Sequence, residues 1–145
     1  MSEQSLKMLI DLATERRDSA TLALAELKRA LGASESQLSQ LEEYRQGYRN
    51  RLREAMAQGV SPGQLDNQRR FLEALDTAIA HQRQRRDDDQ VRREQGLATW
   101  RQDQRKVDAL STLASRRKQD ANHRERRLEQ LRNDEYASRA QSHYT

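Results

Sequence analysis

The sequence predicts an all-α protein, a long antiparallel two-helix coiled-coil hairpin with a C-terminal helical overhang. Three observations support this fold class. The chain has only five Gly and one Pro among 145 residues, which favours long uninterrupted helices. Apolar residues recur at alternating spacings of three and four on both sides of the sequence middle, as in coiled coils. A single segment that combines Gly and Pro interrupts this pattern and predicts a turn.

The composition excludes several classes of protein. Hydrophobic residues make up 34% of the chain and charged residues another 34%, whereas globular domains average about 45–50% and about 25%. Such a chain is too polar for a thick core, which argues against a compact enzyme. The absence of cysteine excludes disulfides and thiolate zinc sites. No apolar run is long enough for a membrane span and no signal peptide opens the chain, so we expect a soluble cytoplasmic protein.

The predicted turn lies in the segment QGVSPGQ, residues 58–64. Gly59 can adopt the left-handed conformation that closes a helix. Ser61, Pro62 and Gln64 then match the first positions of a new helix with a capping box. We therefore expect one coiled-coil domain over 1–145, with helices over 4–58 and 64–138, a turn over 59–63 and a frayed tail over 139–145.

Heptad spacing defines one apolar stripe along each predicted helix. The stripe of the first helix consists of Leu6, Ile10, Ala13, Arg17, Ala20, Leu24, Leu27, Leu31, Ser34, Leu38, Leu41, Arg45, Tyr48, Leu52 and Ala55. The stripe of the second helix consists of Leu65, Gln68, Leu72, Leu75, Ile79, Gln82, Arg86, Asp89, Arg93, Gly96, Trp100, Asp103, Val107, Leu110 and Ala114. A tight turn makes the two stripes antiparallel neighbours, so that they form one seam.

The middle of the second stripe is polar. Antiparallel pairing places Asp89 opposite Ser34, with Arg86 and Arg93 opposite leucines of the first helix. Two arrangements are possible: arginine stems cover the leucines in a loosely packed seam, or a stutter shifts the register. Both predict a mobile centre.

Beyond about residue 118 the second predicted helix has no partner helix. The segment 118–132 remains helix-prone, but Leu128 and Leu131 are its only large apolar residues. We expect an overhang of about 20 residues, on the order of 30 Å long, which frays when unbound because isolated polar helices are marginal in water. Such an arm indicates a binding partner.

No set of residues has a catalytic or metal-binding pattern. The histidines at 81, 123 and 143 lack the four-residue spacing of a helical metal site. The run Asp87–Asp89 cannot converge on one ion, because consecutive helical residues point about 100° apart. It predicts ion pairs with neighbouring arginines at a spacing of four residues, on a solvated face of the helix. Phosphate-binding glycine loops and nucleophile elbows are absent from the sequence. We expect no enzyme activity, no cofactor and no metal.

A second stripe near the turn lies beside the seam and carries aromatic residues. Helical spacing joins Gln37, Leu41, Tyr44 and Tyr48 on the first helix, and Phe71, Leu75, Ala78 and Gln82 on the second. Of these, Tyr44, Phe71 and Ala78 are expected to project from one side of the hairpin. They either widen the packing beside the turn or form a docking surface, since exposed aromatic residues commonly mark interfaces.

The sequence around this stripe resembles the FliJ family of flagellar export proteins. The resemblance lies in QLSQLEEYRQGYRNRL, the G-V-S turn and NQRRFLEALDTAIAHQRQ. The later segment WRQDQRKVDALSTLASRR and the opening segment MLIDLATERRDSATLALAEL are also similar to the family. The resemblance covers most of residues 5–137 and is strongest over 37–84.

This resemblance implies a non-enzymatic, stalk-like component of the bacterial flagellar type III export apparatus, cytoplasmic and peripherally associated with the inner membrane through that apparatus. It implies the export ATPase hexamer, the cytoplasmic domain of the export gate and export chaperones as partners, with no nucleic acid and no direct membrane insertion. The overhanging arm would enter the ATPase ring. The gate-binding residues that it implies are Gln37, Leu41, Tyr44, Tyr48, Phe71, Leu75, Ala78 and Gln82. Family members vary at the position of Gln82, where some have His.

Two alternatives remain open from the sequence. Stalk proteins of injectisome type III secretion systems share this architecture. An arginine-rich coiled coil could also bind RNA or ribosomes, because residues 83–127 hold 14 positive and 8 negative side chains, a balance of +6. RNA binding would weaken steeply with salt, but apart from Trp100, which belongs to the seam, this segment lacks the aromatic side chains that stack on bases.

Overall fold

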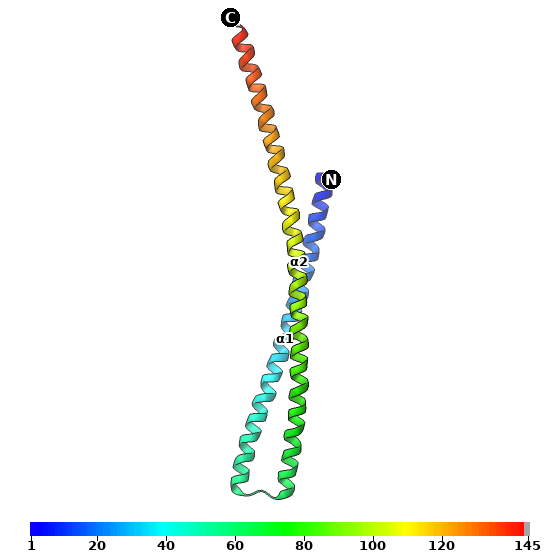
Figure 1. Ribbon diagram of the computed structural model, residues 1–145, viewed down its shortest axis with the longest axis vertical. Coiled ribbons are helices and arrows are strands. Elements are labelled where there is room, and N and C mark those ends of the chain that lie inside the picture. Colours follow the sequence, from blue (N-terminus) through cyan, green and yellow to red (C-terminus); the bar gives the residue numbers. More distant parts are fainter. Residues whose placement is uncertain (144–145) are drawn as a thin grey trace. The chain divides into compact units, whose positions relative to one another are not determined.

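The computed structural model describes residues 1–143 and contains two helices (Figure 1). Helix α1 spans Glu3–Gln58 and helix α2 spans Pro62–His143. The two helices pack against each other as an antiparallel hairpin, and the part of the chain that the structure describes contains no strand. The predicted all-α fold class is confirmed.

The packed segments form two compact units, each built from both helices. The turn unit comprises Asp18–Arg101, and the terminal unit combines Met1–Arg17 with the chain from Gln102 onward. Each unit is a pair of antiparallel helical segments with its own stretch of seam. The single domain expected over 1–145 stays a prediction.

The turn has the chemistry that the sequence predicts. Gly59 has a positive φ of 96°, and its N–H donates a hydrogen bond to the Met56 carbonyl at 3.3 Å. The Gln64 N–H donates to Ser61 Oγ, and the Ser61 N–H donates to Gln64 Oε1, both at 3.3 Å. This reciprocal capping box begins α2 at Pro62, earlier than the expected residue 64.

The outer helix ends also differ slightly from those expected. Ser2 Oγ accepts a hydrogen bond from the Ser5 N–H at 3.0 Å, and this cap begins α1 at Glu3 rather than at residue 4. Helix α2 continues through His143, which corrects the expected helix end at 138 and the frayed tail over 139–143. This segment contains no Gly or Pro, so nothing in it breaks the helix. Residues 144–145 of the expected tail lie outside the described residues.

The predicted seam is confirmed along both helices. Every position of the two apolar stripes is buried or half-buried, whereas nearly all other helical positions are exposed. The buried apolar side chains of the turn unit are Leu24, Leu38, Leu75 and Ile79, and those of the terminal unit are Leu6, Ala13 and Val107. None of the described large side chains is completely buried, because two helices can cover each other on one side only.

The polar centre of the seam is a hydrogen-bonded cluster. Ser34 and Asp89 are only 4% and 8% exposed, and Ser34 Oγ donates a hydrogen bond to Asp89 Oδ2. Arg92 Nη1 lies 3.4 Å from Asp89 Oδ1, and Gln82 Nε2 donates to the Ser34 carbonyl at 3.1 Å. The predicted facing of Asp89 and Ser34 is confirmed, through a specific bond that neither of the two expected arrangements included. The mobility expected at this centre stays a prediction.

Gly96 lies where the two helices of the turn unit approach each other closely. A Cβ atom placed on Gly96 would lie 2.5 Å from Leu27 Cδ1, too near for an undisturbed side chain. Close by, Trp100 Nε1 donates a hydrogen bond to Thr21 Oγ1 at 2.8 Å. The small Gly96 and the large Trp100 are therefore neighbouring seam positions of α2, and the absence of a side chain at Gly96 leaves room for Leu27.

Substituting alanine for glycine at the turn tests how much the positive φ of Gly59 matters for stability. Gly59→Ala should lower the free energy of unfolding by about 1–2 kcal/mol, because an L-residue is strained at positive φ. Gly63→Ala is the matched control: this glycine lies in the first turn of α2 with open space around it, so the substitution should raise stability by up to about 1 kcal/mol. Urea unfolding followed by circular dichroism measures both. Equal effects of the two substitutions would contradict the turn geometry.

A second prediction concerns the buried polar pair. Ser34→Ala should cost about 1–3 kcal/mol, because it removes a hydrogen bond to a buried carboxylate. The double variant Ser34→Ala/Asp89→Leu replaces both polar groups with apolar ones and should recover that loss or exceed the parent stability. Denaturant unfolding of the two variants provides the comparison. A double variant less stable than Ser34→Ala would show that the polar pair itself holds the seam together.

Candidate partner-binding surface

Three aromatic rings and one arginine form a contiguous cluster in the turn unit, which we call the aromatic surface (Tyr44, Tyr48, Arg51 and Phe71). Helical spacing places Tyr44, Tyr48 and Arg51 on one face of α1, and Phe71 meets them from α2. The Phe71 ring centroid lies 4.7 Å from that of Tyr48, in a tilted arrangement, and 6.3 Å from that of Tyr44, edge to face. Tyr44 is 49% exposed and Phe71 is 39% exposed, so the cluster is open to solvent.

Arg51 forms cation–π contacts with two rings of this cluster. Its guanidinium carbon lies 6.0 Å from the Tyr44 ring centroid and 5.9 Å from that of Tyr48. Exposed cation–π contacts contribute about 0.5–1 kcal/mol, and aromatic pairs add about 0.5–1.5 kcal/mol. These contacts restrain the rings within the chain itself, and restrained side chains lose less conformational entropy in any complex that they form.

A polar pair continues the surface along both helices. Gln82 Nε2 of α2 donates a hydrogen bond to Gln37 Oε1 of α1 at 3.3 Å. The same nitrogen donates to the Ser34 carbonyl at 3.1 Å, which connects Gln82 to the polar centre of the seam. Gln37 is exposed and Gln82 is half-buried, so this pair offers amide groups beside the seam.

The structure divides the remaining predicted site residues between surface and seam. Ala78 is exposed and Leu41 is half-buried, whereas Leu75 is only 8% exposed. Leu75 therefore belongs to the seam, where its contribution is to packing. The structure thus brings Tyr44, Tyr48 and Phe71 together as one cluster, and Gln37 and Gln82 as a second pair. Binding of a partner by these residues stays a prediction.

Sequence reasoning missed Arg51 and the ion pairs that span the two helices. Arg51 lies one heptad after Tyr44, and this spacing was the available signal. Arg45 binds Asp76 across the seam through Nε to Oδ1 and through Nη2 to Oδ2 at 3.4 Å. The hydrogen bond to the Asp76 carboxylate raises the pKa of Arg45, because it favours the charged guanidinium. Arg83 pairs with Glu42 at 3.2 Å.

The run Asp87–Asp89 does not form a metal site. Asp87 pairs with Arg86 at 2.8 Å, Asp88 accepts a hydrogen bond from Gln84 at 3.0 Å, and Asp89 turns into the seam. Over residues 1–143, no three His, Cys, Asp or Glu side chains are grouped so that they could bind a metal ion. Within the same range, neither helix has a stretch long and apolar enough to cross a membrane.

A two-helix hairpin with an exposed aromatic surface defines a coiled-coil protein with a candidate binding surface. Comparison with known proteins gives the family. The family model described as "Flagellar FliJ protein" matches residues 1–143. The chain is 32% identical over 136 residues to the flagellar FliJ protein of Escherichia coli (strain K12), covering 94% of this chain and 92% of that protein. It is 31% identical over 136 residues to the flagellar FliJ protein of Salmonella typhi, with the same coverage.

The chain therefore belongs to the FliJ family of flagellar proteins, which confirms the resemblance drawn from the sequence. Membership of this family supports a component of flagellar protein export.

The division between surface and seam predicts different costs of substitution. Leu75→Ala should lower the free energy of unfolding by about 2–3 kcal/mol, because it opens a cavity in the seam. Tyr44→Ala should cost less than about 1 kcal/mol, since half of the side chain already faces solvent. Chemical unfolding of both variants tests this difference. Comparable losses would mean that Tyr44 serves mainly as packing.

Proposed function

We propose that this chain is a non-enzymatic stalk of the bacterial flagellar type III export apparatus that links the export ATPase ring to the export gate. The observation that carries this proposal is the aromatic surface, where Tyr44 and Phe71 stay exposed although their rings are held in contact. Tyrosine and arginine side chains are enriched among the few residues that dominate binding at protein interfaces. Membership of a flagellar family supports the flagellar apparatus over an injectisome as the setting.

The aromatic surface is the part that we propose binds the cytoplasmic domain of the export gate. Tyr44, Tyr48 and Phe71 would supply the apolar contact, and the amides of Gln37 and Gln82 would supply hydrogen bonds beside it. Leu41 and Ala78 extend the contact area, while Leu75 supports it from the seam. Arg51 adds a positive charge, which favours a gate segment that combines apolar and acidic side chains.

The distal part of α2 is the part that we propose contacts the export ATPase. Asn122 is the last α2 residue that lines a groove with α1, and every residue from 123 to 143 is exposed. Three large side chains of this arm lie open to solvent: Leu128 at 56%, Leu131 at 63% and Tyr136 at 75%. Exposed apolar groups on an otherwise polar helix favour a protein partner.

Two further roles belong to the same proposal. We propose that the chain escorts export chaperones to the apparatus. Its location would be the cytoplasm, with peripheral association with the inner membrane through the gate rather than through a membrane span of its own.

Pulldown with purified partners tests the assignment of the two ends. Tyr44→Ala/Phe71→Ala should abolish binding to the gate cytoplasmic domain and preserve binding to the ATPase. Truncation after Asn122 should do the reverse, because it removes the arm and leaves the aromatic surface intact. Leu22→Ala is the control, since Leu22 is a 72% exposed apolar residue outside both proposed regions. Failure of the intact chain to bind either partner would contradict the proposal.

A further inference from the structure

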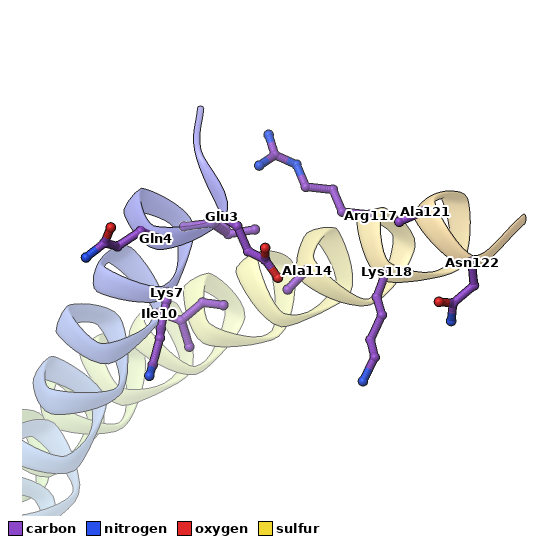
Figure 2. A pocket seen from close by; sticks show the side chains of 10 residues that line it. Glu3, Gln4, Lys7, Ile10, Ala114, Arg117, Lys118, Ala121 and Asn122 are labelled. Atoms are coloured by element: carbon purple, nitrogen blue, oxygen red, sulfur yellow. The ribbon is translucent and has the colours of Figure 1, made fainter. Parts of the chain in front are cut away.

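A groove in the terminal unit forms a second surface, separate from the aromatic surface (Figure 2). It lies between the N-terminal turns of α1 and the α2 segment from Ala114 to Asn122, and its volume is about 720 Å³. Four apolar side chains form its floor: Leu6, Ile10, Ala114 and Ala121. Leu6 is 3% exposed, whereas Ile10 and Ala114 are half-buried, so the seam continues here with one side uncovered.

The charged residues that line this groove are mostly positive. Lys7, Arg117 and Lys118 border it together with a single acid, Glu3. Figure 2 shows Lys7 and Lys118 extending to the same side, with Ile10 and Ala114 between them. Arg117 donates a hydrogen bond to the Met1 carbonyl at 3.0 Å. Among the described residues, no carboxylate forms an ion pair with any of these three cations.

We infer that this groove binds an acidic amphipathic helix of a partner protein as the third strand of a local coiled coil. An elongated, half-covered apolar floor between two helices matches the apolar stripe of a third helix. In coiled coils the positions that flank the apolar stripe carry the charges that choose the partner. Lys7 and Lys118 flank the floor in this way, and carboxylates at the flanking positions of the incoming helix would neutralise them. An incoming helix with basic flanks would meet like charges on both sides.

This inference goes beyond the stalk function and does not depend on it. The groove lies in the terminal unit, whereas the aromatic surface lies in the turn unit. It also precedes the arm that we propose meets the export ATPase. Substitutions at Lys7 and Lys118 are therefore expected to leave both proposed stalk contacts unchanged, and each proposal can fail while the other holds.

Two synthetic peptides test the groove with the full chain. Each is a labelled amphipathic helix of three heptads with Leu at the apolar positions; one carries Glu at the flanking positions and the other carries Lys. Fluorescence anisotropy measures binding of each peptide. The Glu peptide should bind roughly tenfold more tightly or better, because the Lys peptide turns two ion pairs into two repulsions.

The four lysines of the chain supply a matched pair of variants. Lys7→Glu/Lys118→Glu should reverse the preference, so that the Lys peptide binds more tightly. Lys28→Glu/Lys106→Glu changes the net charge equally at two exposed lysines that do not line the groove, and it should keep the preference for the Glu peptide. Circular dichroism confirms that both variants fold.

Three outcomes would overturn the inference. The first is equal binding of the two peptides, or binding of neither, to the parent chain. The second is the same change of preference in both double variants, which would assign the effect to net charge. The third is a dimer in sedimentation experiments that Lys7→Glu/Lys118→Glu dissociates, which would make a second copy of the chain the occupant of the groove.

Discussion

The seam between α1 and α2 is the interaction on which every other feature of this protein depends, because two helices can bury side chains only along the line where they touch. The buried residues are few and none of the described large side chains is completely enclosed. Each apolar contact therefore contributes less than it would in a globular core, and the fold relies on repetition over many heptads. The remaining faces of both helices stay exposed to solvent.

The polar centre of the seam limits the ways in which the two helices can pair. Ser34 and Asp89 satisfy each other only in one register, since a shift by one turn would set Asp89 against Leu31 or Leu38 and Ser34 against an arginine. Buried polar residues at seam positions are known to fix register in coiled coils at a cost in stability. Gln82 bonds to the Ser34 carbonyl and to Gln37, so the same register also aligns the two halves of the candidate site. Correct pairing at the centre thus helps to assemble the surface beside it.

The sequence was sufficient to predict the features that depend on local periodicity. Heptad spacing identified the seam positions, the Ser61–Gln64 capping box located the turn, and helical spacing brought Tyr44 and Tyr48 to the same face as Phe71. Contacts that depend on how the two helices are rotated against each other could not be predicted from the spacing of residues in the sequence. The bond between Ser34 and Asp89 and the ion pair between Arg45 and Asp76 each require the relative rotation of the helices. The groove beside Leu6 and Ile10 forms where α1 leaves part of the α2 seam uncovered. The heptad pattern of the sequence does not show how far apart the two helices lie at that point.

The groove and the aromatic surface differ in how completely the chain itself packs them. The aromatic surface lies at the edge of the seam, which it joins through Tyr48, and its rings are held by contacts with one another and with Arg51. The groove is a stretch of the seam with one side uncovered, where the half-buried Ile10 and Ala114 keep apolar area in contact with water. Binding at the aromatic surface therefore adds contacts to a finished structure, whereas binding in the groove would complete a structure that the chain alone leaves open. A partner in the groove should accordingly stabilise the terminal unit, since ligands that bind only the folded state increase its stability.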